Sequence, residues 1–187
     1  AYKKAFDKAG VILTESMEDL FNYAVAFTQQ SLPKDEGIAI VTNAGGPGIL
    51  STDLIEKLNM GMADLTDETI DYLDENLPTA AATGNPIDIL GDALPDRYAI
   101  ALEAALNDQN VFSVVVLLTP QAMTDSLTTA KNIVEISEKH PEKPVISVFM
   151  GGEWVAEASE YLKDNGVPCY NFPEKGIKTL NALYQYA

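Results

Sequence analysis

The chain has 187 residues, of which 47% are hydrophobic and 21% charged, a composition typical of a globular domain and not of a disordered chain. The longest purely apolar run, Val114 to Leu118, is far too short to cross a membrane, and we expect no secretory signal at the start. One cysteine and one histidine exclude a disulfide within the chain and a metal site built from several such ligands, which favours a reducing cytoplasm.

Acidic residues outnumber basic residues by 28 to 12, which gives a formal net charge of −16. Nucleic acid is therefore not expected as a partner, because phosphate binding requires clustered Lys and Arg. The negative charge favours either a well-solvated surface, as in adaptation to high salt, or docking to a basic partner.

Residues 1–34 are expected to form a helical linker or docking segment, and residues 35–187 a separate domain. A helix is predicted from Ala1 to Ala9, a short strand is possible at Val11 to Leu13, and Ser16 is expected to cap a second helix. A docking segment should expose apolar surface where neighbouring domains pack. In this segment the side chains expected to be exposed are Phe6, Phe21 and Phe27.

From residue 37 onward, short β-branched runs alternate with segments of helical periodicity. The expected strands are Gly37–Thr42, Gly61–Leu65, Val111–Leu118, Pro144–Met150 and Val167–Tyr170. Helices are expected between them, and the apolar face of one is predicted to contain Trp154, Val155, Ala158, Tyr161 and Leu162. This alternation predicts an α/β fold: a doubly wound, flavodoxin-like parallel sheet of about five strands with helices on both faces.

Ligands of doubly wound sheets bind outside the carboxyl ends of the strands, so the loops after the strands are the candidate sites. The first loop contains Asn43, Gly45, Gly46 and Gly48. Its glycines allow backbone N–H groups to approach an anion at the start of a helix. A tight turn that requires glycine is the alternative explanation.

The second loop contains Thr119, Gln121, Ala122 and Met123, and Pro120 is predicted to open the helix that follows. Free N–H groups at Gln121 to Met123 would then face a ligand above the sheet, unless Thr119 is an ordinary N-cap.

Four other residues are candidates for a supporting role. Gly151 and Gly152 form a third glycine-containing loop, and Asn85 and Asp88 lie in the irregular segment from Pro78 to Pro95. Acidic and amide side chains in such segments more often bind local backbone N–H groups.

No catalytic residue is apparent. His140 lies at a polar helix end before a proline, where a histidine is favoured by the helix dipole without any catalytic role. Cys169 follows Pro168 in an apolar strand and is expected in the core.

The same loops carry a resemblance to a known family. Four motifs occur in order: VTNAGGPG at 41–48, GNPID at 84–88 with GDA at 91–93, LTPQAMTD at 118–125, and MGG at 150–152. The set resembles the carboxy-terminal domain of the α subunit of ADP-forming (NDP-forming) acetyl-CoA synthetases, in the succinyl-CoA synthetase superfamily. Residues 1–32 resemble the linker helices that precede that domain.

The resemblance implies a domain of an ADP-forming acyl-CoA synthetase, which converts acyl-CoA, ADP and phosphate into carboxylate, ATP and CoA. In that superfamily a helix N-terminus of such a domain faces a phosphohistidine, and the helix after Thr119 matches it by order. The phosphorylated histidine belongs to a Ser-His-Thr-Gly stretch that is absent here, so this domain is expected to help hold the phosphohistidine or acyl phosphate without catalysing a step.

The resemblance also assigns cofactors and partners. CoA, ADP or ATP, and Mg would be bound by the complete enzyme and not by this domain alone. The expected partners are the CoA-binding, phosphohistidine and ATP-grasp domains of the same enzyme, with no metal site in this chain and no membrane. Two alternatives remain open: a ligand-sensing, synthetase-like region of a protein acyltransferase, and a free-standing flavodoxin-like interaction domain.

Overall fold

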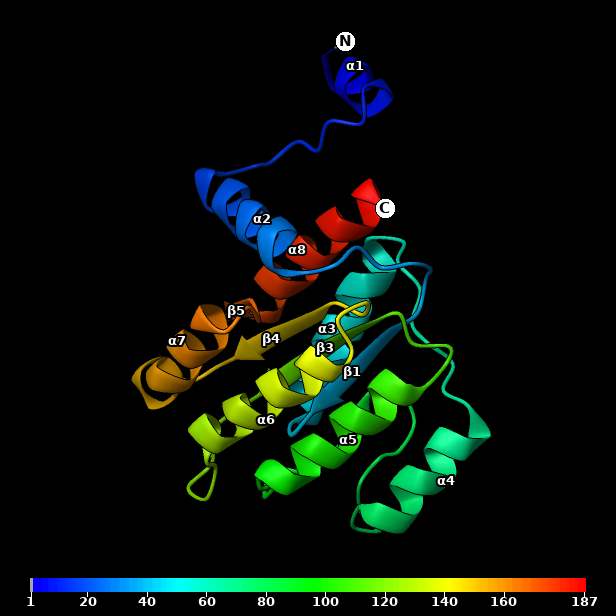
Figure 1. The fold of residues 1–187 in the computed structure, drawn as a ribbon, viewed down its shortest axis with the longest axis vertical. Coiled ribbons are helices and arrows are strands. Elements are labelled where there is room, and N and C mark those ends of the chain that lie inside the picture. The colour runs from blue at the N-terminus through cyan, green and yellow to red at the C-terminus, as the bar shows by residue number, and fades with distance from the viewer. Residues whose placement is uncertain (1) are drawn as a thin grey trace.

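The computed structural model describes residues 2–187, apart from the side chains of residues 2, 3 and 7. From residue 38 onward, helices separate the strands in sequence, and these helices surround the single sheet that the strands form (Figure 1). In chain order the elements are α1 (Tyr2–Lys8), α2 (Met17–Gln29), β1 (Ile38–Thr42), α3 (Gly45–Lys57), α4 (Asp67–Asn76), β2 (Ile87–Asp88), α5 (Pro95–Asn107), β3 (Ser113–Leu118), α6 (Ser126–Lys139), β4 (Val145–Phe149), the 3-10 helix η1 (Gly152–Val155), α7 (Ala156–Asp164), β5 (Cys169–Tyr170) and α8 (Pro173–Tyr186).

The sheet has five parallel strands in the order β2-β1-β3-β4-β5. This order confirms the expected doubly wound, flavodoxin-like fold. β3 lies at the centre, and every residue of its sequence SVVVLL is buried. An apolar strand with no polar alternation is what a central parallel strand requires, because helices cover both of its faces.

Alternate residues of the strands enter two apolar clusters, one on each face of the sheet. Val114, Val116 and Leu118 pack in the cluster beneath α4, α5, α6 and α7. Val115 and Leu117 pack in the cluster beneath α2, α3 and α8. The domain therefore has a core of its own on both sides of the sheet.

Two expected strands are wrong. Residues 61–65 contribute only one isolated bridge, between Met62 and Ile38, and the second strand is Ile87–Asp88. Residues 11–13 have no strand partner among the described residues. Because β2 is only two residues long, part of β1 has no strand beside it on that edge, and the Asn85 side chain bonds the backbone groups there. Its side-chain amide accepts a hydrogen bond from the Ile40 N–H and donates to the Ile38 and Ala63 carbonyls.

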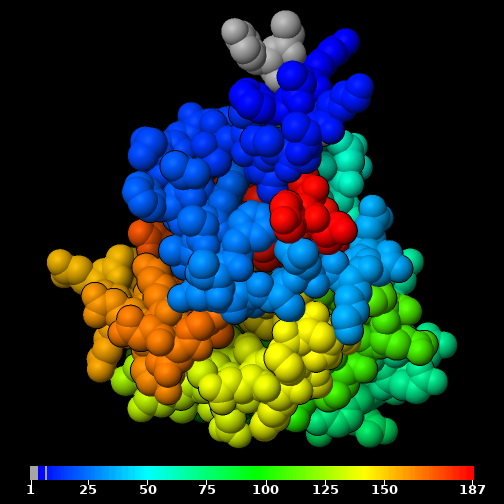
Figure 2. Space-filling view, turned by 45° about the horizontal axis from the view of Figure 1, so that its top comes forward, coloured from blue at the N-terminus to red at the C-terminus, as the bar shows by residue number. Residues whose placement is uncertain are grey.

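The N-terminal segment has two different parts (Figures 1 and 2). α1 and the linker after it stand away from the sheet, whereas α2 packs beside α8. Phe27 of α2 meets Tyr186 edge to face, with 5.4 Å between the ring centroids. Phe6 and Phe21 are exposed as expected, but Phe27 is half-buried by this contact.

Candidate functional site

The loops after the first four strands meet at the carboxyl edge of the sheet. A Cβ placed on Gly91, after β2, would lie 3.8 Å from the Asn43 carbonyl oxygen and 4.0 Å from Cγ of Gln121. Gly151, after β4, lies against Pro120 of the loop after β3. Candidate residues from distant parts of the sequence are thus brought together, as the parallel sheet requires.

The N-terminus of α3 has no side-chain cap. Its N-cap residue is Ala44, whose own N–H donates to the Thr42 hydroxyl at 3.1 Å. Among the described residues, the N–H groups of Gly45 and Gly46 have no acceptor, and both glycines are exposed. The next residue is Pro47, which has no N–H, and Gly48 donates to the Ala44 carbonyl at 3.3 Å. Two backbone donors therefore point out of a 13-residue helix at its positive end.

The Asn43 side chain links the ends of β1 and β3 by hydrogen bonds, so its amide is not free to bind a ligand. Its side chain donates to the Thr119 carbonyl and accepts from the Thr119 N–H, both at 2.8 Å. The side chain is 2% exposed, so an unpaired amide there would be costly. Asn43 and Thr119 thus hold the first and second loops at a constant separation.

The helix after β3 begins later than expected. It starts at Ser126, and Asp125 is its N-cap, with the carboxylate accepting from the Thr128 N–H at 2.9 Å and hydroxyl at 2.7 Å. These bonds hold the pKa of Asp125 below its usual value, the backbone bond having the largest effect. The expectation of a helix opened by Pro120 is wrong, because a short turn intervenes. The positive end of α6 is already occupied by a carboxylate of the chain itself.

The turn in the second loop leaves two donors free. The Gln121 N–H donates to the Thr124 hydroxyl at 2.8 Å, and the Thr124 N–H donates to the Gln121 carbonyl at 3.0 Å. Within the described part of the chain, the N–H groups of Ala122 and Met123 have no acceptor. The hydroxyl oxygen of Thr119 is buried, also without a partner there.

Three of the candidate glycines have a structural reason. A Cβ on Gly48 would meet the Thr42 methyl at 3.2 Å, and one on Gly151 would meet Cγ of Pro120 at 2.5 Å. Gly152 has a φ of +56°, in the left-handed region that favours glycine. In contrast, a Cβ on Gly46 would have no neighbour within 4 Å, so local packing does not explain that residue.

Asp88 lies beside the free donors of α3. One of its carboxylate oxygens is 3.2 Å from the position of a Cβ on Gly45, and the other accepts from the Leu90 N–H at 3.0 Å. Arg97, in the first turn of α5, pairs with Asp92 at 2.6 Å. This ion pair holds the pKa of Asp92 below its usual value through the hydrogen bond from Arg97. Asn85 does not join the loops, because its amide is bonded at the start of β1.

His140 and Cys169 lie outside the loop cluster. His140 is the C-cap of α6, at the end of that helix far from its start at the carboxyl edge. Cys169 is a buried free cysteine, and burial raises the pKa of its thiol. Both positions agree with the roles expected from the sequence.

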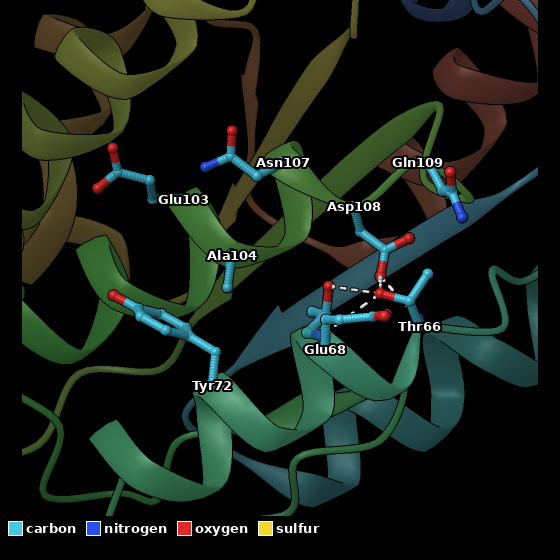
Figure 3. A pocket seen from close by; sticks show the side chains of 9 residues that line it. Thr66, Glu68, Tyr72, Glu103, Ala104, Asn107, Asp108 and Gln109 are labelled. Carbon is cyan, nitrogen blue, oxygen red and sulfur yellow. Dashed lines mark hydrogen bonds between the residues drawn. The ribbon is translucent and has the colours of Figure 1, made fainter.

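A groove of about 590 Å³ lies between α4 and α5 (Figure 3). Glu68, Tyr72 and Glu103 line it, with Asp108 at one end. Because α5 runs antiparallel to the strands, its last residues and this groove lie toward the amino edge of the sheet. The groove is therefore separate from the loop cluster.

Asp108 has a structural role in that groove. Its carboxylate accepts from the Thr66 N–H at 2.8 Å and from the Asn110 N–H at 2.8 Å. Burial raises the pKa of Asp108, but hydrogen bonds from Thr69, Asn110 and Thr66 outweigh this effect and leave the pKa below its usual value. The carboxylate joins the start of α4 to the end of α5.

Sequence reasoning missed three features of the carboxyl edge. Asp125 followed three residues later by Thr128 was a usable N-cap signal. The position of Asp88 beside Gly45 had no local signal. Trp154 was expected on a buried helical face, but it lies in η1 and is 76% exposed.

A doubly wound α/β domain with glycine-containing loops at its carboxyl edge defines the class of this protein. Comparison with known proteins identifies the family within this class. The model of the Ligase-CoA domain family matches residues 38–187, and the chain belongs to this family.

Curated relatives cover the whole chain. It is 41% identical to the acetate–CoA ligase [ADP-forming] of Methanocaldococcus jannaschii and spans 27% of that protein. It is 36% identical to the α subunit of acetate–CoA ligase [ADP-forming] II from Pyrococcus furiosus and spans 41% of that protein. The chain thus spans between about a quarter and two fifths of these relatives' length. The resemblance to ADP-forming acetyl-CoA synthetases is confirmed, whereas a carboxy-terminal position within the α subunit is not supported by these matches.

A solved structure agrees. The dinucleotide-forming acetyl-coenzyme A synthetase 1 of Ca. Korarchaeum cryptofilum, in complex with phosphate and ADP, superposes with a TM-score of 0.93 at 32% identity. The match covers 99% of this chain and 40% of that one.

Two further features are absent from the described residues. No helix there is long and apolar enough to span a membrane. Nor do these residues contain a group of at least three His, Cys, Asp or Glu side chains placed to hold a metal ion.

Proposed function

We propose that this chain is a non-catalytic domain of an ADP-forming acyl-CoA synthetase and that it helps hold a phosphate, an acyl phosphate or a phosphohistidine. The observation that supports this function most directly is the uncapped N-terminus of α3. There the Gly45 and Gly46 N–H groups are free at the edge where the loops meet. Oriented backbone donors at the positive end of a helix are suited to anions.

The second loop supplies the other half of the proposed site. The free N–H groups of Ala122 and Met123 lie in the loop that Asn43 ties to the end of β1. The anion would thus be held by amides of two loops rather than by the start of α6, which Asp125 caps. Asn43, Gly48, Thr119 and Gln121 would act by positioning this backbone.

The electrostatics of the site predict weak binding by the chain alone. Asp88 places a negative charge next to Gly45, and Arg97 is engaged by Asp92. The formal net charge of −16 opposes any anion. Exposed interactions with a helix terminus contribute about 0.3–1 kcal/mol each, so we expect affinity for free phosphate to be on the order of millimolar.

The reaction itself belongs to other domains in this proposal. His140 is at the far end of α6 from the loops, so it is not placed to accept a phosphoryl group. CoA, ADP or ATP, and Mg would be bound by the CoA-binding, phosphohistidine and ATP-grasp domains of the same enzyme. The exposed apolar side chains of residues 6–32 would dock on those domains.

The test is an NMR titration of the chain with phosphate and with acetyl phosphate. The amide signals of Gly45, Gly46, Ala122 and Met123 should shift together as the anion concentration rises to tens of millimolar. Shifts scattered over other residues, with these four unchanged, would contradict the proposed site.

A charge variant sharpens this test. Replacing Asp88→Asn should tighten phosphate binding about fivefold, because two unit charges about 4 Å apart in water interact with about 1 kcal/mol. The control Asp164→Asn changes the net charge equally but lies at the last residue of α7, away from the loops. It should change affinity by less than about twofold, since exposed distant charges are screened. Equal effects of the two variants would mean that only net charge matters.

A further inference from the structure

A chemically labile sequence lies at the C-terminal end of α7. Among the asparagines of the chain, only Asn165 is followed by a glycine. Asparagine before glycine is prone to deamidation, because no Cβ on the next residue hinders attack by its backbone nitrogen on the side-chain amide. Asn165 is exposed, and a Cβ on Gly166 would have no neighbour within 4 Å, so this turn also has open space around it.

The attacking nitrogen is only weakly held in the fold. Asn165 is the C-cap of α7, Gly166 has a φ of +82°, and the Val167 N–H donates to the Leu162 carbonyl at 2.9 Å. These features form a Schellman motif. Its second bond, from the Gly166 N–H to the Lys163 carbonyl, measures 3.4 Å, which is longer than the usual N–H···O bond.

The reaction needs no reactant other than water. The backbone nitrogen of Gly166 loses its proton and attacks Cγ of Asn165, the bond from Cγ to Nδ2 breaks, and the amide group leaves with that proton as ammonia. Water then opens the resulting cyclic imide at one of its two carbonyl carbons. Opening at Cγ gives aspartate. Opening at the backbone carbonyl gives isoaspartate, in which the chain runs through Cβ and Cγ and is longer by one methylene.

The same turn holds the C-terminal end of α2 against the domain. The Gln29 side chain donates to the Lys163 carbonyl at 3.0 Å, and the Gln30 side chain donates to the Gly166 carbonyl at 2.6 Å. Figure 2 shows the turn, in orange, beside the end of α2, in blue. The two acceptor carbonyls lie on either side of Asn165, so an extra methylene there changes their separation.

We propose that Asn165 is a site of spontaneous deamidation and that isoaspartate at this position loosens the C-terminal turn of α2. The two glutamines cannot keep both bonds once the carbonyls move apart, whereas the packing of α2 on α8 is unaffected. The inference goes beyond the proposed function and is independent of the anion site. It concerns how the proposed docking segment, residues 1–34, is attached as the protein ages.

Incubation of the chain, which has its own core, in mildly alkaline buffer tests the modification. Mass spectrometry of the digested chain detects deamidation at residue 165, and labelling by isoaspartate O-methyltransferase separates isoaspartate from aspartate. A synthetic peptide of residues 161–170 gives the rate in the unfolded turn. We expect isoaspartate to form in the folded chain up to about a hundredfold more slowly than in the peptide, because the helix end must open first.

Asn76 is the matched internal control. It is also exposed at a helix end, where its side chain donates to the Tyr72 carbonyl at 2.8 Å. The Asn165 side chain makes the same bond to the Tyr161 carbonyl, also at 2.8 Å. Because Leu77 and not glycine follows Asn76, this asparagine should stay unmodified over the same period.

Hydrogen–deuterium exchange measures the effect on α2. In the purified isoaspartate form, the amides of residues 28–30 should exchange at least about fivefold faster, because two hydrogen bonds are strained or lost. The amides of α5 should be unchanged. Asn165→Gln should prevent both the modification and the loosening. Asn165→Asp adds the charge without the methylene, so it should change the exchange rates less than about twofold.

Three results would overturn the inference. Deamidation of the peptide without any at residue 165 of the folded chain would reject the modification site, as would equal modification of Asn76. Isoaspartate with unchanged exchange in α2 would reject the loosening. Equal loosening in Asn165→Asp would assign the effect to charge and reject the added methylene as its cause.

Discussion

Asn43 and Thr119 exchange two hydrogen bonds of 2.8 Å across the carboxyl ends of β1 and β3. The bonds lie between residues 76 positions apart in the sequence. They are therefore a tertiary constraint on the two loops that supply the proposed anion donors.

This tie predicts the effect of Asn43→Ala. The substitution removes two hydrogen bonds and leaves the Thr119 N–H and carbonyl unpaired, so it should lower the free energy of unfolding by about 2–3 kcal/mol. Equilibrium unfolding in urea measures this change in the free energy of unfolding. The control Asn76→Ala removes an exposed bond to the Tyr72 carbonyl and should cost less than about 0.5 kcal/mol. A similar small loss for Asn43→Ala would show that the tie contributes little.

Alanine substitutions at Gly46 and at Gly151 should have opposite effects on the stability of the fold. A Cβ on Gly46 has open space in the first turn of α3, so Gly46→Ala should leave stability unchanged or raise it by about 0.4–1 kcal/mol. A Cβ on Gly151 would lie 2.5 Å from Pro120, so Gly151→Ala should destabilise by about 1–3 kcal/mol. Thermal unfolding compares the two.

A bulkier residue at Gly46 tests function instead. In the assembled enzyme it should slow phosphoryl transfer while CoA binding stays nearly unchanged, because it blocks only the proposed anion donors. Equal losses in both activities would mean that the glycine maintains only the fold.

Asp125 predicts a dependence of stability on acid. Its folded pKa is depressed, so its contribution is fully present above the unfolded pKa of about 3.9 and is lost as the pH falls through the lower folded pKa. Asp125→Asn keeps a good N-cap but removes the titration. Stability should be unchanged within about 0.5 kcal/mol at neutral pH, and the decline below about pH 4 should become shallower. An unaltered acid profile would contradict this role.

Truncation tests the expected boundary at residues 34 and 35. Removing residues 1–10 should change stability by less than about 0.5 kcal/mol, because α1 stands away from the domain (Figure 1). Removing residues 1–34 also deletes Phe27 and Gln30, whose amide bonds the Val145 N–H at 2.7 Å and the Gly166 carbonyl at 2.6 Å. That loss should exceed about 2 kcal/mol. If both deletions are tolerated equally, α2 is a linker only.

The isolated chain should be inactive. With acetyl-CoA, ADP, phosphate and Mg it should form no ATP, because its only histidine is remote from the loops. A coupled ATP assay measures this, and turnover by the pure chain would reject the proposed division of labour.

The sequence by itself determined the class of fold and the edge to search. Val114 to Leu118 is apolar on both faces, and only a strand covered by helices on each side can bury it. Parallel strands then place the loops after Thr42 and Leu118 at one edge, where glycines free the backbone to act as a donor. Motifs in these loops also identified the family.

Only the tertiary structure decided three other points. β2 is two residues long, too short for any periodic pattern, and it is a strand only because it pairs with Val41 and Thr42 of β1. Pro120 suits a helix start or a loop equally, and the choice depends on contact with Gly151 and on the cap at Asp125. Trp154 has the spacing of a buried helical residue but lies in a 3-10 turn that directs it outward. Local spacing indicates which residues are apolar, whereas burial depends on neighbours that only the folded chain brings into contact.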